Sequence, residues 1–298
     1  PQGWAGVGLT GAPELKGAAD FILSAGVQAP IFNEYESGGP LIFDYGGWRK
    51  VFIDGRNAEY PPPLFLDALH WYQPRVWASL EARWDFGAAV IRRHPTGAWT
   101  TRVLDTDPHW TLAYWDDEAM VYLRDYPENK KLIDEYGLPL LQPGRGNDEW
   151  VEELVKQGKG RELYSELDRS VRRAPRCVNA RLMLAYVLVR LDRPAEGAAQ
   201  AKAAVDLAPG SAQPLFTLGW ARMALGDREE AGKDYRLALA ALKPAERAGL
   251  GADLLNDLGR LAELKGDRKA AAALYKKAVS WNPAQGDALA NLRRLEGF

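Results

Sequence analysis

Four charged side chains follow two short apolar runs, at points where a ligand site could form. Glu34 and Glu36 come at the end of the first run, and Asp54 and Arg56 come at the end of the next. Open α/β sheets place ligand sites at the carboxyl ends of their strands, so these side chains could converge there. Carboxylates are suitable hard ligands for a cation, and the set could also hold a polar sugar.

A structural alternative exists for the same residues. Asp54 and Arg56 could form an ion pair that caps a turn, with Gly55 between them providing the bend. We favour this alternative, and we expect Gly38 and Gly39 to open a helix and allow close packing.

Other catalytic and cofactor motifs are absent from the sequence. His70, His94 and His109 have no metal-like spacing, and no HExxH, P-loop or GxSxG pattern occurs. Cys177 is the sole cysteine, which excludes an internal disulfide, and we interpret it as a buried structural thiol. The glycine motif at 6–11 lacks the strand that a dinucleotide site requires before it. The sequence therefore predicts no catalytic residue, no metal site and no cofactor.

Length and composition predict two soluble domains. The chain has 298 residues, of which 47% are hydrophobic and 26% charged. Residues 1–145 carry 13 Lys and Arg against 19 Asp and Glu, and the remainder carries 25 against 21, so neither half is basic enough to suggest nucleic acid. No apolar run approaches the length of a membrane span and no leader is present. Because the chain begins at Pro1, we expect a soluble part of something longer.

The first half alternates between short strands and helices. Residues 1–12 are expected to be a linker, and 13–141 an α/β domain with a mixed sheet. Strands are predicted over 30–34, 50–54, 87–91, 110–114 and 119–123, and helices over 13–25, 63–83 (interrupted near Pro74) and 98–104. The last two strands form a C-terminal antiparallel hairpin around an acidic turn. The Pro- and Gly-rich segment 138–147 is the predicted domain boundary.

A 34-residue phase runs through the second half, which reads as helices only. Pro175 and Pro209 are one period apart. Gly219, Gly226, Ala231, Tyr235 and Ala238 recur as Gly259, Gly266, Ala271, Tyr275 and Ala278, after an insertion of about six residues. Small residues at such positions let paired helices approach closely, and proline ends a helix.

These positions resemble those that define tetratricopeptide repeats (TPR), most closely in LGWARMALGDREEAGKDYRLALA and LGRLAELKGDRKAAAALYKKAVSWNP. The resemblance implies an all-α TPR solenoid over 148–298. Its predicted parts are a worn first repeat 148–177, repeats 178–211, 212–245 and 252–285, and a capping helix 286–296.

In such arrays, positions 5 and 9 of each repeat lie one helical turn apart and line a concave groove. Here these inner-face residues are Leu182 and Tyr186, Phe216 and Trp220, and Asn256 and Arg260. One end of the predicted groove is apolar and aromatic, and the other is polar. It suits an extended peptide or short helix with an apolar anchor and an acceptor for Arg260. The alternative is that the N-terminal domain itself fills the groove.

A second resemblance concerns residues 31–60, IFNEYESGGPLIFDYGGWRKVFIDGRNAEY. This segment is similar to the opening of the soluble domain behind the membrane helices of bacterial GT-C-type glycosyltransferases. The predicted hairpin 109–124, HWTLAYWDDEAMVYLR, fits the same pattern, whereas Pro40 departs from it. The resemblance implies the extracytoplasmic tail of a membrane enzyme, on the periplasmic or cell-surface side. Such a tail would be inactive alone, because the catalytic aspartates would lie in membrane loops outside this sequence.

The sequence thus predicts a non-catalytic interaction module, in which an α/β domain is followed by a TPR solenoid. The expected partner is a protein or peptide in the groove, with a glycan as a further partner. One alternative is a metal-assisted hydrolase or transferase that uses Glu34, Glu36 and Asp54. Another is an oligomerisation surface formed by the repeats.

Overall fold

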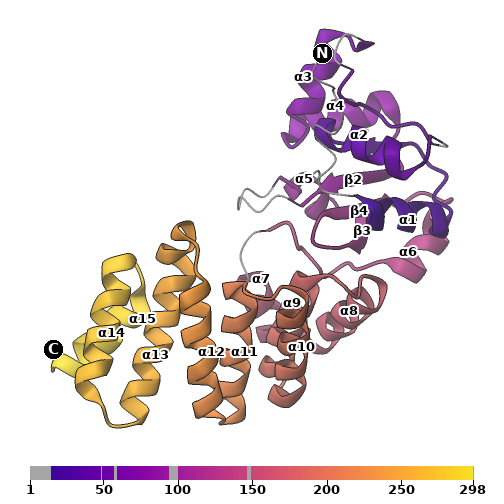
Figure 1. The fold of residues 1–298 in the computed structure, drawn as a ribbon. Coiled ribbons are helices and arrows are strands. Elements are labelled where there is room, and N and C mark those ends of the chain that lie inside the picture. The colour runs from indigo at the N-terminus through magenta and orange to yellow at the C-terminus, as the bar shows by residue number, and fades with distance from the viewer. Residues whose placement is uncertain (1–14, 48, 57–58, 94–99, 146–148, 298) are drawn as a thin grey trace, which may run out of the picture. The chain divides into compact units, whose positions relative to one another are not determined.

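The computed structural model describes residues 15–47, 49–56, 59–93, 100–145 and 149–297 (Figure 1). The predicted linker 1–12 and its glycine motif lie outside these residues. The chain divides into two compact units. The first contains the described residues up to Gln157 together with Ser165–Arg176, and the second contains Gly158–Tyr164 and the residues from Cys177 onward.

A four-stranded mixed sheet forms the centre of the first unit. Its strands are β1 (Ile31–Asn33), β2 (Ala88–Arg92), β3 (Trp110–Trp115) and β4 (Ala119–Arg124), in the order β1-β2-β4-β3. β1 runs parallel to β2, whereas β2 and β3 both pair with β4 in the antiparallel sense. The structure therefore contains the predicted mixed sheet and its C-terminal hairpin.

The first unit contains the predicted helices, one of them divided, and also a helix over 130–136 that the sequence pattern did not predict. They are α1 (Lys16–Ala25), α2 (Tyr35–Asp44), α3 (Pro62–Leu69), α4 (Pro74–Trp84), α5 (Arg102–Asp105), α6 (Lys130–Tyr136) and α7 (Glu149–Lys156). The predicted interrupted helix 63–83 is two helices, because Pro74 begins α4 and has no backbone N–H to continue α3. Gly38 and Gly39 lie inside α2 and do not open it.

Aromatic side chains form the core between these helices and the sheet. The ring of Phe32 on β1 has four aromatic neighbours, with centroid distances between 5.1 and 5.5 Å. These neighbours are Phe52, Trp71, Trp77 and Phe86. Trp71 and Trp77 are buried, while Trp84 is 45% exposed and contacts Phe52. Core packing therefore accounts for two of the three tryptophans around α4.

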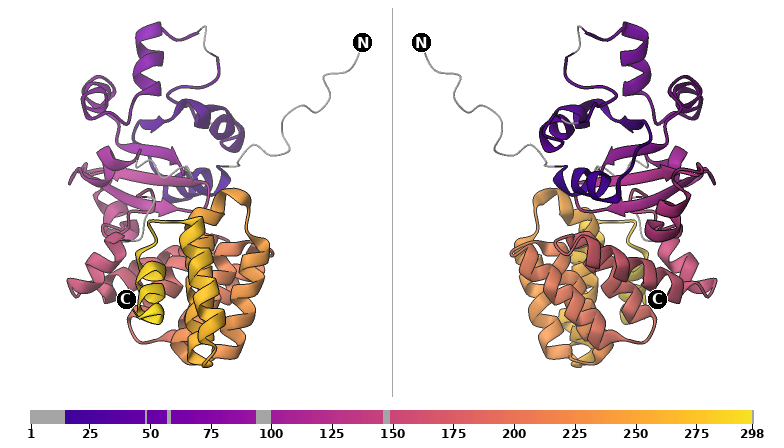
Figure 2. Two further views of the ribbon diagram at one scale, coloured as in Figure 1. Left: turned by 90° about the vertical axis from the view of Figure 1, so that its left-hand side faces the viewer. Right: turned by 90° about the vertical axis from the view of Figure 1, so that its right-hand side faces the viewer.

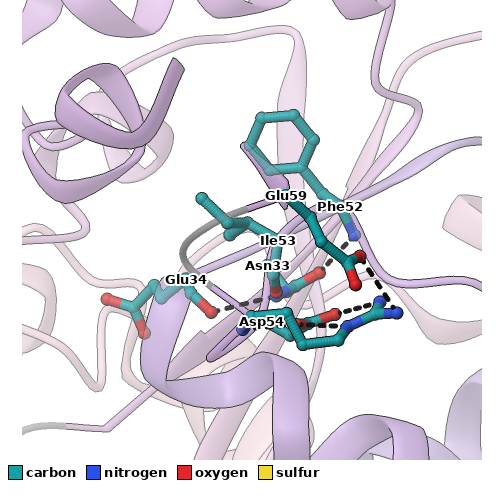
Figure 3. Close-up of polar contacts among 7 residues, drawn as sticks. Asn33, Glu34, Phe52, Ile53, Asp54 and Glu59 are labelled. Atoms are coloured by element: carbon teal, nitrogen blue, oxygen red, sulfur yellow. Dashed lines mark hydrogen bonds and ion pairs between the residues drawn. The ribbon is translucent and has the colours of Figure 1, made fainter. Parts of the chain in front are cut away.

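The predicted strand over 50–54 is wrong, and a side chain replaces the missing strand pairing (Figure 3). Asn33 Nδ2 donates to the carbonyl oxygens of Ile53 (2.8 Å) and Glu34 (2.9 Å), and Asn33 Oδ1 accepts from Phe52 N (2.7 Å). These bonds satisfy backbone groups that a strand ladder would otherwise satisfy. Gly38 lies against the same segment, since a Cβ at Gly38 would be 2.0 Å from the Ile53 oxygen.

Paired helices make up the second unit. They are α9 (Val178–Arg190) with α10 (Pro194–Leu207), α11 (Ala212–Leu225) with α12 (Arg228–Ala241), and α13 (Ala252–Leu264) with α14 (Arg268–Trp281), followed by α15 (Gly286–Glu296). Figure 2 shows that the two helices of a pair run antiparallel. The insertion before α13 forms a 3₁₀ turn, Pro244–Glu246, and a π turn, Arg247–Gly251.

Helix α8 (Gly160–Arg173) contributes residues to both units. In its second half, Glu166 accepts a hydrogen bond from Leu140 N (3.0 Å), and Ser170 accepts one from the Trp115 indole (3.1 Å). The guanidinium groups of Arg169 and Arg173 donate to carbonyl oxygens of residues 135–137 at 2.9 to 3.0 Å. Side-chain hydrogen bonds therefore hold the second half of α8 in the first unit.

Position 15 of each predicted repeat follows the first helix and has a left-handed backbone conformation. Gly158, Gly226 and Gly266 have φ values of 79°, 90° and 81°. The corresponding residue in the repeat 178–211 is Asp192, with φ 60°. An L-residue adopts this conformation at a cost of about 1–2 kcal/mol, so glycine is the better residue for this turn.

The residues at positions 8 and 24 contact each other, and where one is larger the other is smaller. A Cβ added at Gly219 would lie 2.7 Å from the ring of Tyr235, and one added at Gly259 would lie 2.5 Å from the ring of Tyr275. In the repeat 178–211 the same two positions are Ala185 and Ala201, which share one buried cluster. A glycine thus faces a tyrosine and an alanine faces an alanine, which keeps the helix pairs closely packed.

Candidate functional site

The predicted polar site in the first unit begins with two glutamates that bind the same arginine. Glu34 is 9% exposed, and its carboxylate accepts hydrogen bonds from Trp71 Nε1 (3.2 Å) and from the backbone N of Arg92 (2.7 Å). Glu36 is exposed and pairs with the Arg92 guanidinium at 3.1 Å. Because Arg92 ends β2, both glutamates connect the start of α2 to the neighbouring strand.

Asp54 and Arg56 form a self-contained pair. Asp54 Oδ1 accepts from the backbone N and the Nε of Arg56, both at 2.9 Å, and Oδ2 accepts from Nη2 at 2.6 Å. These hydrogen bonds lower the pKa of Asp54 to about 2. Arg56 also lies 3.2 Å from Glu59. The geometry is that of the structural alternative, an ion pair that caps the turn around Gly55.

The structure does not gather these four residues around one point. Figure 3 shows the Glu34 carboxylate directed away from Asp54. Within the described ranges, no group of three or more His, Cys, Asp and Glu side chains is placed to hold a metal ion. The contacts of Glu34 thus connect elements of the fold, whereas those of Asp54 and Arg56 stay within one turn.

The aromatic end of the predicted groove is formed by direct contact between helices of neighbouring repeats. Tyr186 on α9 and Trp220 on α11 stack, with centroids 5.1 Å apart and 15° between the ring planes. Phe216, one turn before Trp220, lies 5.8 Å from the ring of Tyr235. Leu182, Tyr186, Phe216 and Trp220 are all half-buried. Tyr186 and Trp220 therefore form an aromatic surface that spans two helices and remains partly exposed, with Phe216 one turn away on α11.

At the polar end, Asn256 and Arg260 are placed differently from one another. Asn256 is 6% exposed, and its Oδ1 accepts a hydrogen bond from Asn291 on α15 (3.0 Å). Arg260 exposes 56% of its side chain and donates through Nη1 to Asp257 (3.0 Å). Asn256 thus connects α13 to α15, whereas Arg260 presents donors to solvent.

Asp257 is a functional candidate that sequence reasoning missed. It is 9% exposed and is hydrogen-bonded to both Arg260 and the hydroxyl of Tyr235. Burial raises the pKa of Asp257, and Arg260 opposes this shift. The position of Asp257 next to Asn256, among the buried leucines of α13, gives no distinct signal in the sequence. Its effect is to hold Arg260 in a fixed position.

The family comparison identifies repeats in the second unit. The sequence model of the tetratricopeptide repeat matches residues 212–241 and 252–285, which coincide with the pairs α11–α12 and α13–α14. No curated protein matches the chain. Across the described part of the chain, every helix is too short or too polar to cross a membrane.

Several solved structures resemble part of the chain. TTC0263, a thermophilic TPR protein of Thermus thermophilus, is 19% identical, with a TM-score of 0.45 over 57% of this chain and 88% of that chain. MamA is 20% identical, with a TM-score of 0.41 over 49% and 82%. YrrB, a TPR protein with an unusual peptide-binding site, is 21% identical, with a TM-score of 0.39 over 47% and 69%.

The repeat assignment rests on the match to the family and on the helix pairs themselves. The matched segments have the small residues at positions 8 and 20 and the left-handed glycine at position 15 that such pairs need. Residues 212–241 and 252–285 are therefore tetratricopeptide repeats, and proteins that contain such repeats mediate protein–protein interaction.

Proposed function

We propose that the second unit binds a segment of a partner protein on the inner-face residues Leu182, Tyr186, Phe216, Trp220 and Arg260. The observation that carries this proposal is the stacked pair of Tyr186 and Trp220, which joins two helices into one half-buried aromatic surface. Aromatic residues and arginine supply most of the binding energy at protein interfaces. The matched repeats belong to a family whose members bind peptides or proteins.

The chemistry of this surface favours an extended peptide or short helix with an apolar anchor and an acidic residue. The half-buried rings would accept the anchor. Among the residues that the structure describes, Arg260 donates to Asp257 through Nη1, and a guanidinium has five N–H donors, so donors remain for a carboxylate of the partner. The buried Asp257 fixes the guanidinium before binding, which reduces the entropy that binding would cost.

A peptide selection tests the proposal. Phage-displayed random peptides would be selected on the full chain, and synthetic versions of the enriched sequences measured by fluorescence polarisation. We expect an aromatic or aliphatic anchor near an acidic residue, and binding weakened about ten-fold or more by Trp220→Ala or Arg260→Ala.

Leu237→Ala is the matched control, because Leu237 is 56% exposed on α12, a second helix of its pair. This variant should bind within about two-fold of the unmodified chain. Enriched peptides that bind Trp220→Ala and the unmodified chain equally would refute the proposal, provided that circular dichroism shows both to be folded.

We further propose that this module is the extracytoplasmic part of a membrane-embedded, glycosyltransferase-like protein, with a glycan-bearing protein among its partners. The support is the resemblance of residues 31–60 and 109–124 alone, because the comparisons with known proteins add none. Sequencing the gene upstream of the Pro1 codon tests it. Several encoded membrane spans would support the proposal, and an upstream region that encodes none would refute it.

A further inference from the structure

A small cavity lies within the first unit, between the turn that follows α5 and the segment that follows α6. Its volume is about 230 Å³. The residues of its wall that matter for recognition are Asp105, Asp107, Trp110, Leu112, Tyr122 and Gln142. None of them belongs to the inner face of the repeats or to the polar residues around Glu34 and Asp54.

The size of the cavity limits what it can hold. A water molecule occupies about 30 Å³ of liquid, so the cavity has room for several waters or for one compact organic molecule. Pockets for drug-sized ligands typically measure about 300–1,000 Å³. A ligand of about ten non-hydrogen atoms or fewer is therefore the appropriate class.

The cavity wall is negatively charged. It contains two carboxylates and no Lys, Arg or His side chain. Asp105 Oδ1 accepts a hydrogen bond from the Tyr122 hydroxyl (2.7 Å), and Oδ2 accepts one from the Thr101 hydroxyl (2.6 Å). Tyr122 is buried, which raises its pKa well above the ordinary value, so Tyr122 stays the proton donor. These two hydroxyls hold the Asp105 carboxylate in place.

Asp107 supplies the second carboxylate and is half-buried. Its Oδ1 accepts from the backbone N of His109 at 2.9 Å, which fixes the side chain in a local turn. Its Oδ2 accepts no hydrogen bond from any residue that the structure describes. A ligand that donates hydrogen bonds and carries positive charge would satisfy this oxygen.

The remaining wall is aromatic and aliphatic. Trp110 is 6% exposed, and its indole N–H donates to Glu81 Oε1 at 2.7 Å, so the ring is fixed as part of the wall. Aromatic rings attract cations through their quadrupole. Four leucines, each at most 3% exposed, complete the apolar part of the wall and contribute little of its surface: Leu104, Leu112, Leu138 and Leu141.

We propose that this cavity binds a small organic cation, a primary ammonium on a compact apolar body. The ammonium would lie at the carboxylates of Asp105 and Asp107, and the body would lie against Trp110 and the leucines. A neutral molecule of the same shape would lack the charge-assisted hydrogen bonds and bind more weakly.

A matched pair of probes tests this proposal on the full chain. Cyclohexylmethylamine and cyclohexylmethanol have the same skeleton and differ in the ammonium group. Calorimetry should show the amine binding about ten-fold or more tightly than the alcohol. Asp107→Asn should remove this advantage and leave binding of the alcohol unchanged, which also shows that the variant is folded.

Asp125→Asn is the control, because Asp125 is exposed and lies outside the cavity wall. This variant should bind the amine as the unmodified chain does. Three results would overturn the proposal: equal affinity for the two probes, unchanged amine binding by Asp107→Asn, or amine binding weaker than about 10 mM.

Discussion

Replacing one buried glycine in the matched repeats provides a direct test of how the helix pairs are packed. In Gly219→Ala, the new methyl group would lie 2.7 Å from two ring carbons of Tyr235 and 3.2 Å from the carbonyl oxygen of Ala231. Carbon atoms pack at about 3.5–4.0 Å, so the ring or the helix must move. Tyr235 is 1% exposed and hydrogen-bonded to Asp257, so its ring cannot rotate into solvent.

The magnitude follows from two opposing terms. Overpacking a close-packed core costs about 1–3 kcal/mol. Alanine favours a helix interior over glycine by about 1 kcal/mol, which offsets part of that cost. We therefore expect Gly219→Ala to change the free energy of unfolding by about 0 to −2 kcal/mol, a net loss of stability wherever the overpacking exceeds the helix preference.

Gly232→Ala on α12 is the matched control. A methyl group there would lie 3.4 Å from Arg236 Nη1 and 3.5 Å from Leu261 Cδ1, which are ordinary contacts. The helix preference of alanine then acts alone and should stabilise the chain by up to about 1 kcal/mol. Because the helix preference is common to both variants, they should differ by the overpacking cost alone, about 1–3 kcal/mol.

Urea-induced unfolding, followed by far-ultraviolet circular dichroism, measures both variants. Gly219→Ala and Gly232→Ala of equal stability would refute the packing argument. A second measurement locates the clash. Tyr235→Ala should lower the free energy of unfolding by about 1 kcal/mol less in the Gly219→Ala background than in the unmodified chain. Ala185 and Ala201 already show that two alanines pack at these positions.

Three further predictions use the same denaturation assay. Gly38→Ala should destabilise the first unit by about 3 kcal/mol or more, because its Cβ would lie 2.0 Å from the Ile53 carbonyl oxygen. The adjacent Gly39→Ala is the control and should not destabilise the unit, because its Cβ would have no neighbour within 4 Å. Asp192→Gly should stabilise the second unit by about 0.5–1 kcal/mol, because φ is 60° there, and a loss of stability would contradict this. Burial raises the pKa of Glu166 from 4.5 to about 7, so the folded state binds this proton more tightly than the unfolded state does. The resulting stabilisation is complete below about pH 4.5 and is lost as the pH rises through about 7. Glu166→Gln should therefore reduce the change in the free energy of unfolding over this range by about 1–3 kcal/mol. An unchanged pH profile would contradict the assignment.

Sequence patterns predicted the elements whose hydrogen bonds are local. The hairpin β3–β4 and the helix pairs follow from periodicity and turn residues, and the structure contains them. The segment 50–54 has the composition of a strand, but the side chain of Asn33 occupies the backbone groups that a strand would pair. No periodicity reveals such a replacement, because it depends on contacts between distant residues.

The candidate sites show the same limit. Residue spacing indicated which side chains share a repeat face, and the stacking of Tyr186 on Trp220 agrees with it. Spacing could not show that Asn256 turns inward to Asn291, or that Arg260 is held by a buried Asp257. The repeat 178–211 carries alanines where its neighbours carry a glycine and a tyrosine, and the family match does not extend to it.

Helix α8 determines where the chain can be cut. A fragment that stops at residue 145 would lose Glu166, Ser170 and the two arginines that bind the carbonyl oxygens of residues 135–137. It would also leave the backbone groups that these side chains bind without their partners, so it should be cleaved more readily by proteases. The shortest fragment of the first unit that keeps its hydrogen bonds therefore ends at Arg176, thirty-one residues beyond the point at which composition alone would cut.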